Sequence, residues 1–192
     1  MIRRIRYLGL KWCAMAALVF AQRQFALALF ETMLLEFPGD EYALASKGHL
    51  QAQMGDRRGA VVTMEHLVQA YPDNARHWFN FGFLLEELEH YERAEAALRR
   101  STEITPSLDR AWYGLGLVLI RLRRFDEAVI ALKKNTQLQP MSPYGWYQLA
   151  RVHVDRHEPD EALRIIRHLK RFEPKVAAQL ERETGIFAPP AG

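Results

Sequence analysis

The stretch that decides the fold is residues 111–128, which read Ala-Trp-Tyr-Gly-Leu-Gly-Leu-Val-Leu-Ile-Arg-Leu-Arg-Arg-Phe-Asp-Glu-Ala. Its apolar residues Trp112, Leu115 and Leu119 lie three and four positions apart, which is the spacing of an amphipathic helix. A second helical stretch over 126–138 leads to Pro140. Because proline lacks a backbone N–H and restricts the residue before it, it ends this second helix. The stretch therefore predicts two helices joined by a short turn.

The same pattern recurs every 34 residues along the chain. A proline, an alanine twelve positions before it, and a small residue twelve positions before that keep this period five times, so all fifteen slots are filled. The prolines are Pro38, Pro72, Pro106, Pro140 and Pro174; the alanines are Ala26, Ala60, Ala94, Ala128 and Ala162; the small residues are Ala14, Gly48, Gly82, Gly116 and Ala150. A side chain larger than a methyl group at the small or alanine slots would push the paired helices apart and open a void. The period therefore predicts five helix pairs that cross closely.

These residues resemble the tetratricopeptide repeat, and residues 111–128, in the unit that closes at Pro140, are a close match to its consensus. The resemblance covers units 7–40, 41–74, 75–108, 109–142 and 143–176, after a basic lead at 1–6. It implies an all-α fold, a right-handed α-solenoid of antiparallel helix pairs. Since the last pair would otherwise expose an apolar face, we expect a short capping helix over 175–184. Residues 177–192 then hold most of this helix, its stop at Gly185 and a loose tail from Ile186.

Some positions depart from the family's pattern. Lys47 and Gln51 stand at slots that are normally apolar, so we expect the second unit to be the least stable. Ser101 and Asn135 replace the usual small apolar residue near the end of the second helix.

Composition bounds the class of protein. The chain has 192 residues, of which 49% are apolar and 26% are charged, as in a soluble, core-forming protein. A single cysteine, Cys13, excludes an internal disulfide and a cysteine-based zinc site. The net charge of +3 equals the contribution of Arg3, Arg4 and Arg6, so the chain from Tyr7 onward is neutral. This balance argues against a large nucleic-acid surface, which needs a basic stripe.

No motif in the sequence supports catalysis. His153 and His157 are four residues apart, but the first holds a packing slot and the second falls in a turn, so we predict no metal site there. The sequence contains no His-Glu-x-x-His, no glycine-rich phosphate loop and no Gly-x-Ser-x-Gly elbow. We therefore predict a protein that is not an enzyme and that uses no cofactor, metal or small-molecule substrate.

The resemblance implies that fixed slots of each first helix line a concave groove. We call the following the groove-slot residues: Arg76, Phe79, Asn80, Phe83, Arg110, Tyr113, Leu117, Arg121, Tyr144, Tyr147 and Arg151. The early repeats add Lys11, Met15, Tyr42, His49 and Gln53. Aromatic and arginine side chains are typical of binding hot spots, and guanidinium groups pair with carboxylates.

The groove composition favours a bacterial-type adaptor or scaffold that binds a partner's peptide segment with acidic and apolar residues. In the alternative interpretation, the arginines pair with acids of the protein itself, such as Glu86, Glu87 or Asp155. A weaker alternative is RNA binding by a helical-repeat surface, through arginines with interleaved tyrosines that could stack on bases.

The amino-terminal segment allows two interpretations. Residues 12–21 form an unbroken apolar run behind several basic residues, which is the outline of a secretory signal. The favoured interpretation is the first helix of the first repeat, because Leu10, Ala14 and Ala17 occupy the expected slots, and it places the protein in the cytoplasm. In the alternative, residues 1–21 act as a signal or anchor of a membrane-associated or exported, periplasmic assembly factor. The run is shorter than the ~20 residues that a spanning helix needs.

Overall fold

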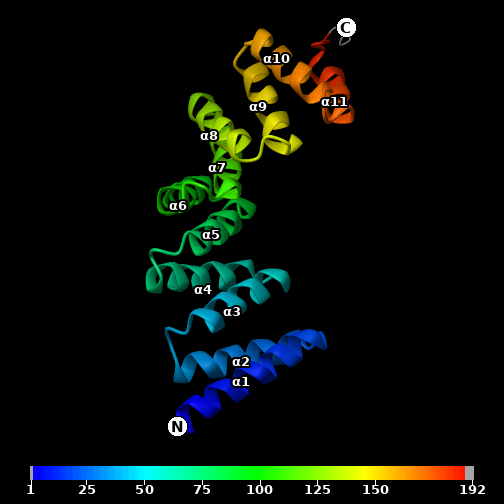
Figure 1. Cartoon of the computed structure of the whole chain (residues 1–192). Helices are drawn as coiled ribbons and strands as arrows, with labels where there is room; N and C mark the ends of the chain where they lie inside the picture. Colours follow the sequence, from blue (N-terminus) through cyan, green and yellow to red (C-terminus); the bar gives the residue numbers. More distant parts are fainter. Residues whose placement is uncertain (1, 189–192) are drawn as a thin grey trace. The chain divides into compact units, whose positions relative to one another are not determined.

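The chain is all-helical in the computed structural model, which describes residues 2–188 (Figure 1). Within that range there are helices and no strand, which confirms the predicted all-α class. The chain divides into two compact units between His90 and Tyr91. Unit 1 contains α1 (Ile2–Val19), α2 (Arg23–Glu36), α3 (Glu41–Gln53), α4 (Arg57–Ala70) and α5 (Ala75–Glu87). Unit 2 contains α6 (Tyr91–Ile104), α7 (Asp109–Arg121), α8 (Phe125–Leu138), α9 (Pro143–Asp155), α10 (Pro159–Lys170) and α11 (Pro174–Thr184).

Each helix packs against the next helix of its unit. In unit 2 the first helices of the fourth and fifth repeats, α7 and α9, also touch, and α9 contacts the capping helix α11 in the same way. The division between the units falls inside the third predicted repeat, 75–108, and assigns α5 to unit 1 and α6 to unit 2.

The small and alanine slots are buried as the period predicts. Ala26, Ala60, Ala94, Ala128 and Ala162 all have no exposed surface. In the fourth repeat, a Cβ atom built on Gly116 would lie only 2.7 Å from two atoms of Leu132, which is itself fully buried. Because neither helix leaves room for a methyl group here, glycine is needed for the close approach of α7 and α8.

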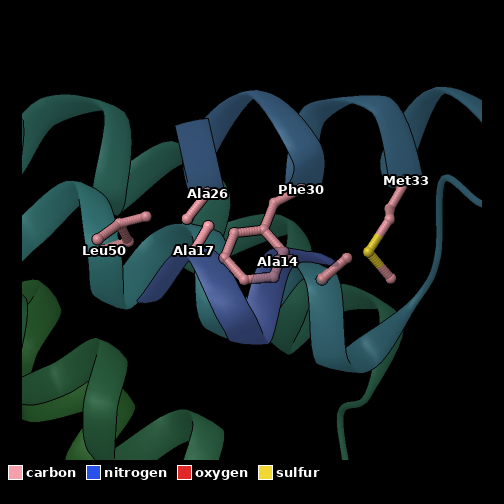
Figure 2. Packing of buried hydrophobic residues seen from close by; sticks show 7 residues of the cluster. Ala14, Ala17, Ala26, Phe30, Met33 and Leu50 are labelled. Atoms are coloured by element: carbon pink, nitrogen blue, oxygen red, sulfur yellow. The ribbon is translucent and has the colours of Figure 1, made fainter. Parts of the chain in front are cut away.

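The first repeat has the same arrangement. Figure 2 shows Phe30 of α2 reaching toward Ala14 and Ala17 of α1, and all three side chains are buried. Leu50 of α3 belongs to the same cluster, so the core continues into the second repeat. α1 therefore packs as the first helix of a repeat. Between residues 2 and 188, no helix combines the length and the apolar character needed to cross a membrane.

Hydrogen bonds from tryptophan join the end of one repeat to the start of the next. The indole N–H groups of Trp78, Trp112 and Trp146 each donate to the carbonyl oxygen of the repeat-ending proline six residues earlier, at 2.8–2.9 Å. The proline slot thus ends a helix and also supplies the acceptor that orients the next tryptophan. These half-buried tryptophans therefore satisfy their N–H groups within the chain, in the third, fourth and fifth repeats.

The turn inside each repeat also follows the 34-residue period. Ala21, Gly55, Glu89, Arg123 and His157 all adopt positive φ angles, between 56° and 87°. In each case the next residue donates its N–H to a carbonyl five positions back, for example Arg124 to Leu119 at 2.9 Å. This is the Schellman ending of a helix, which usually has glycine at the left-handed position. Four of the five turns use another residue there, at a cost of about 1 kcal/mol each.

Two of the departures from the family pattern have their polar groups satisfied. Gln51 is buried, accepts a hydrogen bond from Thr63 at 2.7 Å and donates to Asp56 at 3.0 Å. Asn135, on α8, donates to the carbonyl oxygen of Asp109 at 3.0 Å, at the start of α7. Because a buried polar group is costly only when it lacks a partner, these bonds offset the burial of both side chains.

The described part of the carboxyl end has contacts to α10 and α11. α11 ends at Gly185, which has a φ of 70°, as predicted. The expected loose tail from Ile186 differs, because the Ala188 N–H donates to Glu181 at 2.7 Å and Lys170 donates to the Ala188 carbonyl at 2.6 Å. Lys170 also pairs with Glu181 at 2.8 Å. We call these three residues the C-terminal clasp; the rest of the predicted tail, 189–192, lies outside the described residues.

The clasp predicts a pH dependence. The hydrogen bond from Lys170, together with that from the Ala188 N–H, holds the pKa of Glu181 below its usual range. A carboxylate with a lowered pKa in the folded state stabilises it above the ordinary pKa and loses that contribution as the pH falls through the lowered value. We expect the NMR shift of the Ala188 amide to move with a midpoint below about 4.3. A Glu181→Gln variant should show no such step, and a midpoint at or above the ordinary value would contradict the clasp.

Candidate protein-binding surface

Unit 1 contains a cavity of about 450 Å³ formed by α3, α4 and α5. Its lining residues are His49, Ala52, Gln53, Arg57, Met64, Phe79, Asn80, Phe83, Leu84 and Glu87. The volume falls in the range of about 300–1,000 Å³ that is usual for ligand pockets. The cavity brings together the groove-slot residues Phe79, Asn80 and Phe83 with His49 and Gln53, which the sequence also assigned to the groove.

The apolar part of the cavity combines buried and exposed surface. Met64 and Leu84 are buried side chains, whereas Phe83 is 52% exposed. The rings of Phe79 and Phe83, one helical turn apart on α5, have centroids 6.4 Å apart and planes tilted by 34°. Gly48 lets Met64 come close, because a Cβ atom there would lie 3.0 Å from the Met64 side chain. The result is an aromatic wall that is open to solvent beside an apolar floor.

The polar part of the cavity contains charged side chains of both signs, Arg57 and Glu87, and the amide groups of Gln53 and Asn80. His49 and Gln53 are joined by a contact of 2.9 Å between the His49 Nε2 and Gln53 Nε2 atoms. In residues 2–188, no ion pair or side-chain hydrogen bond engages Asn80, Arg57 or Glu87. Side-chain donors and acceptors therefore surround the aromatic wall.

Arg57 is placed by the way α4 begins. It is the first residue of that helix, directly after Asp56, whose carboxylate accepts a hydrogen bond from the Gly59 N–H at 2.9 Å. This N-cap fixes the first turn of α4 at the edge of the cavity. Arg57, Met64 and Glu87 are cavity residues that the sequence did not assign to the groove. Arg57 and Met64 lie on α4, the second helix of its repeat, whereas the family's groove positions all belong to first helices. Conversely, Arg76 was assigned to the groove but does not line the cavity.

In unit 2, four groove-slot residues follow one face of α7. Arg110, Tyr113, Leu117 and Arg121 are spaced by three or four residues, which places them on the same side of a helix. Both arginines are exposed, and neither has an ion pair within the described part of the chain. The alternative in which they pair with the protein's own acids therefore finds no support at these two positions.

On α9, two groove-slot residues are engaged within the protein. The Tyr147 hydroxyl donates to Glu183 of α11 at 2.6 Å, and the Arg151 guanidinium lies 5.8 Å from the centre of the Tyr147 ring. The bond to Glu183, with a smaller effect of burial, raises the pKa of Tyr147, and the same bond lowers the pKa of Glu183. Tyr144 is exposed. The α9 part of the predicted groove is thus partly occupied by contacts to α11.

The histidines considered for metal binding have other surroundings. His153 is buried and its Nδ1 lies 2.6 Å from a carboxylate oxygen of Glu158, which also pairs with Arg156 at 2.8 Å. The bond with His153 lowers the pKa of Glu158. His157 occupies the left-handed turn position. Across residues 2–188, no group of three or more histidine, cysteine, aspartate or glutamate side chains is arranged to hold a metal ion.

Comparison with known families and structures agrees with this geometry. Residues 46–109 and 84–140 match the family described as Tetratricopeptide repeat. The chain contains tetratricopeptide repeats. The matched residues include the second, third and fourth units that the 34-residue period predicts, except for the first few residues of the second and the last two of the fourth. No curated protein matches the sequence.

Several solved tetratricopeptide repeat structures are similar to this one. MamA from Desulfovibrio magneticus RS-1 is 19% identical with a TM-score of 0.77, over 92% of this chain and 96% of that chain. YrrB, a tetratricopeptide repeat protein with an unusual peptide-binding site, is 19% identical with a TM-score of 0.78, over 88% of each chain. A tetratricopeptide repeat protein from Parabacteroides merdae is 20% identical with a TM-score of 0.81, over 93% of this chain and 73% of that chain. At these identities the likeness establishes the fold.

Proposed function

We propose that this tetratricopeptide repeat protein is a non-enzymatic adaptor that holds a segment of another protein against its groove-slot residues. The cavity in unit 1 is the observation that supports this most, because residues of three helices converge there on an exposed aromatic wall. YrrB offers a parallel, since it combines the same fold with a peptide-binding site.

The cavity suits an apolar side chain carried by an extended backbone. An apolar side chain of the ligand that enters the cavity would bury surface against Phe79, Phe83 and Met64. Burial of one large apolar side chain contributes about 1.5–3 kcal/mol to the free energy of binding. Asn80 and Gln53 each carry an amide that can donate and accept, so they match the N–H and C=O groups of a peptide. The proposed ligand is therefore a peptide segment with at least one large apolar residue.

The arginines of α7 favour an acidic residue in the bound segment. Arg110 and Arg121 are exposed and keep their donors free of internal ion pairs in the described residues. A charge-assisted hydrogen bond to a carboxylate contributes about 1.5–3 kcal/mol when it is buried by the partner, and ~0–1 kcal/mol when it stays exposed. We therefore propose that the exposed face of α7 binds an acidic residue of a partner protein.

Replacing the most exposed wall residue of the cavity tests the apolar contact. We expect a Phe83→Ser variant, used as bait in a lysate of the native host, to lose the proteins that the wild-type chain retains. The matched control is Val62→Ser on α4, because Val62 is 54% exposed and Phe83 52%, and Val62 does not line the cavity. Quantitative mass spectrometry measures the retained proteins. Equal recovery with both variants, at unchanged helicity, would contradict the assignment of the cavity.

Reversing the charges of α7 tests the acidic contact separately. A double Arg110→Glu, Arg121→Glu variant should release the same proteins while its melting temperature stays unchanged, because both side chains are exposed and unpaired. An Arg167→Glu, Arg171→Glu variant makes the same change of net charge on other exposed positions of unit 2 and should retain them. If both double variants lose the partner equally, net charge rather than the α7 face governs binding, and the assignment is wrong.

A further inference from the structure

We propose that the outward face of α1 docks on an anionic lipid surface. α1 has two apolar faces, and only one of them is used by the fold. Leu10, Ala14 and Ala17 pack into the core of unit 1. The other face carries large apolar side chains with exposed fractions between 44% and 80%: Ile5, Leu8, Trp12 and Val19; Phe20, which is also exposed, follows directly after the helix.

The exposed residues form a continuous stripe. Ile5, Trp12 and Val19 are seven residues apart, which is close to two helical turns, and Leu8 falls between the first two. Gly9 and Ala16 are also exposed and fill the gaps without interrupting the stripe. A stripe of this kind on a soluble protein marks a surface that is covered by another body.

The charge around the stripe is of one sign. The first thirty residues contain five basic side chains, Arg3, Arg4, Arg6, Lys11 and Arg23, and no acidic one. Arg4 and Lys11 are seven residues apart and flank one side of the stripe, and Arg6 lies toward the other side.

Three of these cations touch the protein: Arg3 donates to the Glu36 carbonyl, Arg6 pairs with the Glu36 carboxylate and Lys11 lies over the Tyr42 ring. Arg6 nonetheless keeps a 65% exposed side chain, and within residues 2–188 Arg4 and Arg23 make no ion pair, side-chain hydrogen bond or ring contact.

The apolar stripe and the basic residues around it favour a lipid surface over a protein as the binding partner of α1. An apolar helix face bordered by lysine and arginine, with a tryptophan among its apolar residues, is the composition of helices that lie in the membrane interface. Anionic headgroups attract each nearby cation, whereas a second copy docking through the same face would bring Arg4, Arg6 and Lys11 close to the same three cations of its partner. Since no described helix can cross a bilayer, the contact is one of lying on the surface.

Vesicle co-sedimentation with the full chain tests the proposal. We expect binding to vesicles that contain phosphatidylglycerol in phosphatidylcholine, little binding to phosphatidylcholine alone, and a loss of binding as salt rises. A Trp12→Glu, Val19→Glu variant should bind about tenfold more weakly or worse. The matched control is Leu35→Glu, Ile130→Glu, which makes the same charge change at two exposed apolar residues outside the stripe.

Three outcomes would overturn the proposal. Equal binding to neutral and anionic vesicles would remove the role of the basic residues. Equal loss of binding in both double-glutamate variants would mean that net charge, not the stripe, is responsible. A dimer seen by analytical ultracentrifugation, abolished by Trp12→Glu, Val19→Glu and accompanied by no vesicle binding, would assign the stripe to a second copy of the chain. Because Phe83 and Arg110 lie outside α1, the capture experiments on the groove-slot residues remain independent of this result.

Discussion

The close crossing of the two helices of a repeat, in the four repeats that lie within one unit, is the constraint on which the structure depends. Five alanines with no exposed surface meet the neighbouring helix at 34-residue intervals. Gly116 shows how little space remains, since even one methyl group would come within 2.7 Å of Leu132. Well-packed interiors transmit such a misfit instead of absorbing it. The 34-residue spacing of the small residues therefore fixes how the helices pack, and with it the positions of the side chains on their other faces.

The candidate binding surfaces follow from that register. Because first helices of successive repeats have equivalent positions, residues at equivalent slots reach a common side within a unit. In unit 1 this brings His49 of α3 to the same cavity as Phe79 and Phe83 of α5. The tryptophan-to-proline hydrogen bonds hold successive repeats at a constant offset, for example Trp78 to Pro72. In a binding surface built in this way, substitutions at the groove-slot residues change what the surface binds and leave the packing between the helices unchanged.

Much of this could be predicted from the sequence, because the signals were local and periodic. The helices, their ends and the buried alanine slots follow from side-chain size and from proline. The left-handed turn residues were not predicted, since Glu89 and Arg123 give no sign of a positive φ without the surrounding hydrogen bonds. Arg57 was missed because it enters the cavity from the first turn of a second helix. The C-terminal clasp joins residues that only the folded chain brings together, as Lys170 and Ala188 are eighteen residues apart.

The most direct test of the central claim is the stability of an Ala128→Leu variant beside an Ala96→Leu control. Ala128 is fully buried on α8, whereas Ala96 is exposed on α6. The two variants therefore add the same atoms at a buried position and at a solvent-exposed one. Urea denaturation should show the free energy of unfolding lowered by about 1–3 kcal/mol for Ala128→Leu and changed by less than about 0.5 kcal/mol for Ala96→Leu. Equal stability of the two variants would contradict the close crossing of the helices.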